Sequence, residues 1–342
     1  MKASIFCYSL KGKETARKIA DLITKEYGAE VECFAPERLA EGGFGPIPKP
    51  SGDFYGEHFR NKEMYISVGS VGIAVRHIAP YVRSKVTDPA VIVIDELGKH
   101  VIPVLSGHIG GANRISQRLA EILGGEAVIT TATDINGKFA VDEWAARNGL
   151  AISGMKTAKD FAAAILERDL PLKSDLPIKG KLPAGTFAGE EGELGAYITW
   201  TKDSPFEKTL RLIPKCLYLG IGCRKGIEAE AVRQAVYKVA EDNRIDLRAV
   251  KGIASIDIKK DEEGLLIFAK EMGIVPEFFT AEELQAVEGD FTPSEFVKGV
   301  TGVDNVCERS ALKNAEKLIV KKTALNGVTV SVAVTDMEVS FE

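Results

Sequence analysis

The segment that decides the fold spans residues 3–34 and reads ASIFCYSLKGKETARKIADLITKEYGAEVECF. Residues 3–8 predict a buried strand, residues 13–27 an amphipathic helix, and residues 31–34 the next strand. A strand, a helix and a second strand in this order favour an open, mostly parallel sheet with right-handed crossovers. The predicted fold class is therefore α/β.

Further strand signals follow this unit. Residues 64–68 and 90–94 predict buried strands, and 90–105 predicts a hairpin at the sheet edge because Asp95–Lys99 is turn-like. Residues 36–56 are rich in Pro and Gly, which predicts a long loop without regular structure, a common form for a lid. Later in the chain, Asn326-Gly327 is typical of a type I′ hairpin turn.

The length of 342 residues exceeds what one hydrophobic core usually organises, so we expect several domains. The middle of the chain is predicted to be a small module, with antiparallel strands at 194–201 and 209–213. The expected division is an N-terminal α/β domain over 1–135, a middle α+β module over 136–214 and a C-terminal α/β domain over 215–342.

The composition excludes several classes of protein. The net charge of −5 comes without a lysine- or arginine-rich block, which argues against a nucleic-acid partner. Five cysteines without a CxxC pair indicate reduced thiols, as in a cytoplasmic protein. No apolar run approaches the roughly 20 residues that span a bilayer, so no membrane partner is expected.

Three glycine clusters lie at predicted junctions between strand and helix, at 69–72, 106–111 and 220–226. Each could offer backbone amides at a helix N-terminus to an anion, or glycine could merely permit a tight turn and close packing. Basic and polar side chains follow each cluster, which favours recognition of carboxylates. The candidate substrate-binding residues are Gly69, Ser70, Gly72, Arg76, Gly107, Gly110, Gly111, Asn113, Arg114, Gly222, Cys223 and Arg224.

The candidate catalytic residues are His108, Glu96 and Ser106. His108 lies in a glycine loop before a helix, where an imidazole could take a proton from water. Glu96 follows a buried strand, where open sheets place ligand contacts, although a hairpin turn would attract it too. Ser106 opens the same loop as His108, but Val104 stands where a nucleophile elbow requires glycine. The histidines form no metal-binding helical pair, so no metal site is predicted.

Four runs together resemble the cobalt-precorrin-5A hydrolase family of anaerobic cobalamin biosynthesis: VGSVGIAVR (68–76), DPAVIVID (88–95), LSGHIGGAN (105–113) and TTATD (130–134). The resemblance continues in GIGCRKG (220–226), ASID (254–257) and GVTV (327–330). This last part resembles a domain that also occurs as a separate protein in the aerobic pathway. The resemblance covers nearly the full length and is least clear over 136–214.

The resemblance implies a hydrolase that opens the δ-lactone of cobalt-precorrin-5A, releasing acetaldehyde and cobalt-precorrin-5B. The substrate is an anionic tetrapyrrole that carries its own cobalt, so no cofactor is expected. We assign His108 or Glu96 as base, the 107–111 amides as oxyanion donors, and Arg76, Arg114 and Arg224 as carboxylate anchors.

Neighbouring pathway enzymes and a second copy of the chain are the protein partners to consider. The alternative functions are a non-catalytic corrinoid carrier, and a transferase that uses the glycine loops for a phosphorylated substrate.

Overall fold

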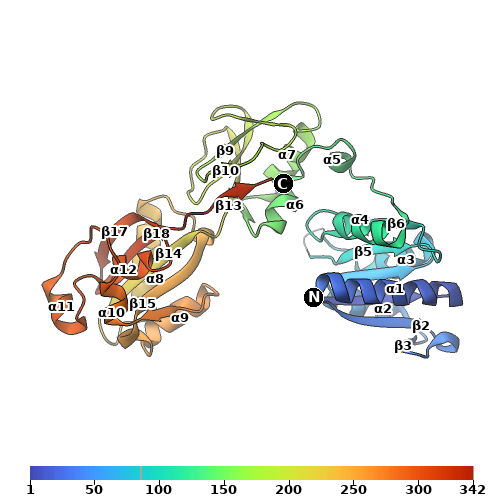
Figure 1. Cartoon of the computed structure of the whole chain (residues 1–342), viewed down its shortest axis with the longest axis horizontal. Helices are drawn as coiled ribbons and strands as arrows, with labels where there is room; N and C mark the ends of the chain where they lie inside the picture. Colours follow the sequence, from blue (N-terminus) through green and yellow to red (C-terminus); the bar gives the residue numbers. More distant parts are fainter. Residues whose placement is uncertain (85–86, 342) are drawn as a thin grey trace. The chain divides into compact units, whose positions relative to one another are not determined.

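The computed structural model describes residues 1–84 and 87–341 (Figure 1). Its contacts separate into two compact units, Met1–Glu143 and Trp144–Glu342, which are taken in turn. Within the described residues, no helix has both the length and the apolar composition needed to cross a membrane.

The described part of the first unit forms a seven-stranded sheet in the order β3-β2-β1-β4-β5-β6-β7. Neighbouring strands are parallel except for β5 and β6, so the predicted open α/β sheet is confirmed. The strands are β1 Lys2–Cys7, β2 Glu30–Pro36, β3 Phe44–Ile47, β4 Met64–Val68, β5 Ala90–Ile94, β6 His100–Leu105 and β7 Glu126–Ala127. The helices are α1 Leu10–Tyr27, α2 Gly52–Asn61, α3 Val71–Ile78, α4 Ala112–Leu123, α5 Ala132–Ile135 and α6 Val141–Arg147, the last of which continues into the second unit.

The two faces of this sheet bury different side chains because strand residues alternate. Ile5 faces an aliphatic core with Ile19 of α1, whereas Phe6 faces an aromatic core with Tyr55 of α2 and Tyr65 of β4. Helix α1 starts where the Ser9 side chain accepts a hydrogen bond from the Gly12 amide.

Residues 36–56 are not the structureless loop that their composition predicted. They contain a 3-10 turn at Glu37–Leu39, strand β3 and the start of α2. Strand β3 pairs in parallel with β2. Pro46 is tolerated there because β3 is an edge strand, where the missing amide leaves few ladder bonds unmade. The prediction of a long loop without regular structure is therefore wrong for this segment.

The residues of the second unit that the structure describes form two five-stranded sheets, in the orders β11-β9-β12-β13-β8 and β16-β15-β14-β18-β17, and a small β10-β19 pair. Its strands are β8 Ala151–Ile152, β9 Leu170–Ser174, β10 Ile178–Lys179, β11 Thr186–Ala188, β12 Leu194–Ile198, β13 Lys208–Ile213, β14 Leu217–Cys223, β15 Val250–Ile256, β16 Glu277–Phe279, β17 Lys317–Leu325, β18 Val328–Val334 and β19 Val339–Ser340. Its helices are α7 Met155–Ala164, α8 Ala229–Asp242, α9 Glu263–Glu271, α10 Ala281–Gln285, α11 Glu295–Thr301 and α12 Val306–Leu312.

Two strand pairs of this unit test the sequence predictions. The β17-β18 hairpin is confirmed, with positive φ angles of 50° at Asn326 and 81° at Gly327. Strands β12 and β13 are parallel, so the predicted antiparallel pairing is wrong. Residues 199–207 carry the chain back to the other end of the sheet, which places Lys208 opposite Leu194.

Close packing fixes α12 against the C-terminal sheet. A Cβ atom on Gly220 of β14 would lie 1.8 Å from the carbonyl oxygen of Cys307 and 2.7 Å from the amide nitrogen of Ala311. Both of these atoms belong to the backbone of α12, so no side chain can move aside to make room.

We therefore expect Gly220→Ala to lower the free energy of unfolding by at least about 2 kcal/mol, because the helix must shift from the sheet. Gly299→Ala is the matched control, since a Cβ on that helical glycine meets no atom within 4 Å. Urea denaturation of both variants measures the difference, and equal midpoints would contradict the packing argument.

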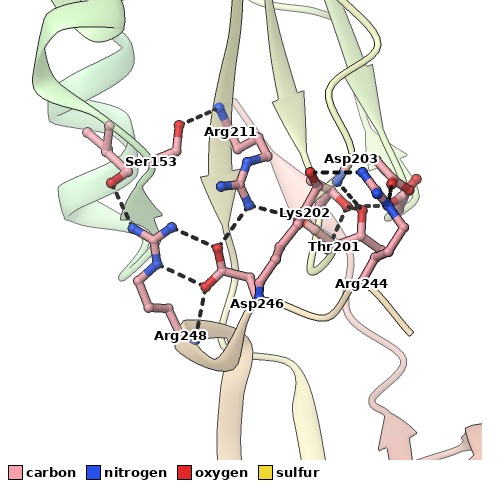
Figure 2. Close-up of polar contacts among 11 residues, drawn as sticks. Ser153, Thr201, Lys202, Asp203, Arg211, Arg244, Asp246 and Arg248 are labelled. Atoms are coloured by element: carbon pink, nitrogen blue, oxygen red, sulfur yellow. Dashed lines mark hydrogen bonds and ion pairs between the residues drawn. The ribbon is translucent and has the colours of Figure 1, made fainter. Parts of the chain in front are cut away.

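A network of hydrogen bonds and ion pairs around Asp246 joins the two larger sheets of this unit (Figure 2). Its carboxylate accepts from Arg211 of β13 at 2.9 Å and from Arg248 at 2.7 and 2.9 Å. Burial works to raise the pKa of Asp246, but the hydrogen bonds from Arg248 and Arg211 outweigh it and lower the pKa to about 2. The network therefore favours the ionised carboxylate.

Because this pKa is depressed by folding, the ionised group stabilises the protein above the ordinary pKa of aspartate, and this stabilisation is lost as the pH falls toward 2. We expect Asp246→Asn to cost about 2 kcal/mol at pH 7 and about half as much near pH 3. Urea denaturation between pH 3 and pH 7 measures the difference in unfolding free energy between the wild type and this variant. Asp261→Asn, a change at an exposed position, is the control. A difference that does not depend on pH would refute the assignment.

Candidate active site

The strand register separates the first two glycine clusters. Val68 of β4 lies opposite Ile94 of β5, so Gly69 and Glu96 follow the carboxyl ends of parallel strands. Strand β6 runs the other way and places Leu105 opposite Val91, near the amino end of β5. The two edges are about 15 Å apart, the length of a five-residue strand. The glycine clusters at 69–72 and 106–111 therefore lie at opposite edges of this sheet.

At the carboxyl edge, Glu96 is held by a residue that the sequence did not single out. The Ser9 hydroxyl donates to Glu96 Oε2 at 2.6 Å while it caps α1. Ser9 follows β1, where the order of the sheet reverses between β1 and β4. Gly69, Ser70 and Gly72 lie at the start of α3, and Arg76 is exposed in its last turn. The position of Ser9 after the first strand was the available signal.

At the amino edge, the loop 106–111 has a strained and tightly packed backbone. Ser106 has a φ of 56°, a left-handed conformation that costs a residue with a side chain about 1 to 3 kcal/mol. A Cβ on Gly107 would lie 2.6 Å from Asn113 Oδ1, and one on Gly110 would lie 2.5 Å from Ser106 Cβ. Such strain persists where surrounding contacts enforce it, which is common at functional sites.

This loop holds the His108 imidazole between two carboxylates. Nδ1 lies 3.0 Å from Asp142 Oδ1, and Nε2 lies 2.8 Å from Asp134 Oδ2. The hydrogen bond with Asp142 raises the pKa of His108 to about 9, burial opposes this, and the bond with Asp134 adds to it. With a proton on each nitrogen, the ring has no lone pair for a proton from water. This arrangement does not suit His108 as a general base.

Asp134 and Asn113 complete the polar cluster of the amino edge. Asn113 Nδ2 donates to Asp134 Oδ2 at 3.1 Å and to Thr131 Oγ1 at 3.0 Å. In the part of the chain that the structure describes, the donors to Asp134 all reach Oδ2, which leaves Oδ1 for another molecule. Asp134 ends the run TTATD, so the sequence carried a signal for it, whereas it gave none for Asp142.

Other predicted residues of this edge have structural partners. The Ser106 hydroxyl donates to the Asp88 carbonyl at 2.9 Å, and the Gly111 amide donates to the His108 carbonyl at 2.9 Å. Gly111 is therefore not an available oxyanion donor. The Arg114 guanidinium lies 5.9 Å from the centre of the Tyr27 ring.

One group of donor atoms in the cluster could hold a metal ion. Ligand atoms of His108, Asp134 and Glu143 all lie within 4.8 Å of one another. They come from the 106–111 loop, α5 and α6, which are far apart in the sequence.

The third glycine junction already binds a carboxylate of the protein itself. The amides of Gly226 and Ile227 donate to Glu262 Oε1 at 2.7 and 3.0 Å. Gly222 and Cys223 belong to β14 and pair with β18. Burial raises the pKa of the Cys223 thiol to about 11, so it stays protonated at neutral pH. The Arg224 amide donates to the Gly327 carbonyl at 3.0 Å.

Comparisons with known proteins agree with the resemblance seen in the sequence. Residues 53–134 match the family described as Cobalamin synthesis G N-terminal, and residues 217–333 match Cobalamin synthesis G C-terminus. The chain is 32% identical to cobalt-precorrin-5A hydrolase of Salmonella typhimurium, over 97% of both chains.

Two further matches cover a part or most of the chain. Protein CobE of a Sinorhizobium species is 30% identical over 34% of this chain and 79% of its own length. A solved cobalamin biosynthesis protein G homolog from Sulfolobus solfataricus is 23% identical, covers 97% of both chains and has a TM-score of 0.43.

The α/β fold and these matches together identify the chain as a hydrolase of cobalamin biosynthesis. Within that class, the chain belongs to the cobalt-precorrin-5A hydrolase family.

The packing of the 106–111 loop can be tested without touching a polar group. Gly110→Ala forces Ser106 apart from residue 110 and should displace His108, and a shift of 1 Å at a catalytic group can cost about 100-fold in rate. Gly154→Ala is the control, because the nearest atom to its new Cβ is 3.9 Å away. The hydrolase activities of both variants are compared with that of the wild type at equal folded fraction, which circular dichroism measures. An active Gly110→Ala enzyme would show that the loop geometry is not needed.

Proposed function

We propose that this chain opens the δ-lactone of cobalt-precorrin-5A with water and releases the extruded two-carbon fragment as acetaldehyde, giving cobalt-precorrin-5B. The observation that carries the proposal is the polar cluster of His108, Asn113, Asp134 and Asp142 at the amino edge of the first sheet. The relatives named cobalt-precorrin-5A hydrolase support the choice of substrate.

In the first step, water adds to the lactone carbonyl and the ring C–O bond breaks. Asp134 takes a proton from the attacking water through Oδ1, because Oδ2 is held by His108 and Asn113. The departing oxygen receives a proton and becomes a hydroxyl. Lactone and water together thus give a carboxylic acid and an alcohol.

In the second step, the new hydroxyl loses its proton and its C–O bond becomes a carbonyl. The carbon–carbon bond to the macrocycle breaks, its electron pair passes to the macrocycle, and the macrocycle takes up a proton. The two-carbon fragment leaves as acetaldehyde. The oxygen that gains a proton when the lactone opens is the oxygen that loses it in the second step. A single acid–base cluster can therefore serve both steps.

The amino edge suits this chemistry better than the carboxyl edge. At the carboxyl edge, Glu96 is exposed to solvent and accepts from the Ser9 hydroxyl that caps α1. At the amino edge, the His108 and Asp134 side chains are only 14% and 19% exposed, so their charges act in a partly desolvated place. Electrostatic effects on a developing oxyanion are strongest there.

We expect Asp134→Asn to reduce acetaldehyde release by about 100-fold to 10,000-fold, the usual contribution of one acid–base group. Asp21→Asn, a change of the same type on exposed α1 of the same unit, should leave the rate unaltered. Acetaldehyde is followed with alcohol dehydrogenase, and lactone opening by the mass gain of one water.

Full activity of Asp134→Asn would remove this residue from the chemistry. A wild-type chain that binds the corrinoid without forming acetaldehyde would instead be a carrier. Binding of phosphate or a nucleotide in place of the corrinoid would point to a transferase.

A further inference from the structure

The cluster at the amino edge brings one histidine and three carboxylates together. Asp134, Asp142 and Glu143 all lie around the His108 ring. We propose that His108 Nε2, Asp134 and Glu143 hold one divalent cation that accepts oxygen and nitrogen ligands, of the Mn²⁺ or Zn²⁺ class. This inference rests on the proposed function and names an inorganic cofactor for it, which the sequence did not lead us to expect.

The distances fit a single ion. Two ligands that are each about 2.1 Å from a metal lie about 3.0 Å apart at a right angle and about 4.2 Å apart when opposed. The His108 Nε2 to Asp134 Oδ2 separation is 2.8 Å, and all three donor atoms lie within 4.8 Å of one another. Shifts of a few tenths of an ångström would place all three around one ion.

The proposed ligands are themselves hydrogen-bonded to neighbouring side chains, as metal ligands in proteins commonly are. Asp142 Oδ1 lies 3.0 Å from His108 Nδ1, which turns Nε2 toward Asp134. Asn113 donates to Asp134 Oδ2, and it is itself only 2% exposed. A carboxylate on the far nitrogen of a ligating histidine fixes its tautomer and its ring orientation.

Three protein ligands leave positions open for water and substrate, as in catalytic metal sites. The ion would take the place of the proton that His108 shares with Asp134. It would bind the attacking water and lower the pKa of that water, and the Asp134 oxygen beside it would accept the proton released. The bonds made and broken are those of the two steps given above.

Binding of Mn²⁺ to the full-length chain, cleared of metal with a chelator, tests the site directly. We expect one equivalent to bind with an electron paramagnetic resonance signal of a protein-bound ion and to raise the melting temperature. His108→Gln and Glu143→Gln should weaken binding by 100-fold or more, because each removes a ligand. Asp142→Asn should weaken it by about 10-fold to 100-fold through the orientation of His108. Glu126→Gln, an exposed change on β7, is the control.

Absence of binding, or binding that His108→Gln and Glu143→Gln leave unaltered, would overturn the metal site. Activity separates this result from the proposed function. A chelated wild-type chain that still releases acetaldehyde at full rate, while Asp134→Asn does not, would leave the proposed function standing without the metal. Loss of activity on chelation and its return with Mn²⁺ or Zn²⁺ would support both.

Discussion

The reversal of the chain between β5 and β6 is the constraint on which the first unit depends. Every other pair of neighbours in this sheet is parallel. Because β6 runs backward, the loop after it emerges at the amino edge, beside the start of β5 rather than beside its end. Helix α4 then starts from that edge and leads back to β7, which pairs with the start of β6. One antiparallel strand thus decides that the 106–111 loop meets α5 and the start of α6, and that Glu96 meets neither.

Much of the fold could be predicted from the sequence, because individual strands and turns leave local patterns in it. The strands at 64–68 and 90–94 were predicted with their observed bounds, since buried parallel strands are continuous apolar runs. The Asn326-Gly327 turn was predicted because its two positive φ angles need those residue types. Strand β3 was missed because Pro and Gly usually end strands, and only an edge position makes them acceptable.

The candidate site could be predicted only in part, because the order and direction of strands in a sheet are not local properties of the sequence. His108 and Asn113 were identified from the glycine loop, and they do lie in one cluster. Glu96 was placed with them although it lies at the other edge. Asp142 and Glu143 could not be found, because no spacing in the sequence links a helix start to a loop more than thirty residues earlier.

The three glycine junctions show why a shared motif did not mean a shared role. At Gly226, a carboxylate from Glu262 already occupies the amides at the helix start. At Gly69, the neighbouring Ser9 and Glu96 bind each other. At 106–111, glycine instead lets the backbone pack so closely that His108 must face Asp134 and Asp142.

Two carboxylates on one imidazole need a positive charge between them, because an unbalanced buried carboxylate is costly. A proton on His108 supplies that charge, and so would a divalent ion with the ring neutral. Glu143 favours the ion, because it brings a third ligand atom within 4.8 Å of those of His108 and Asp134. In either form the positive charge lies between carboxylates of this cluster, and an ion with open coordination positions could also stabilise the charge that develops on the lactone oxygen.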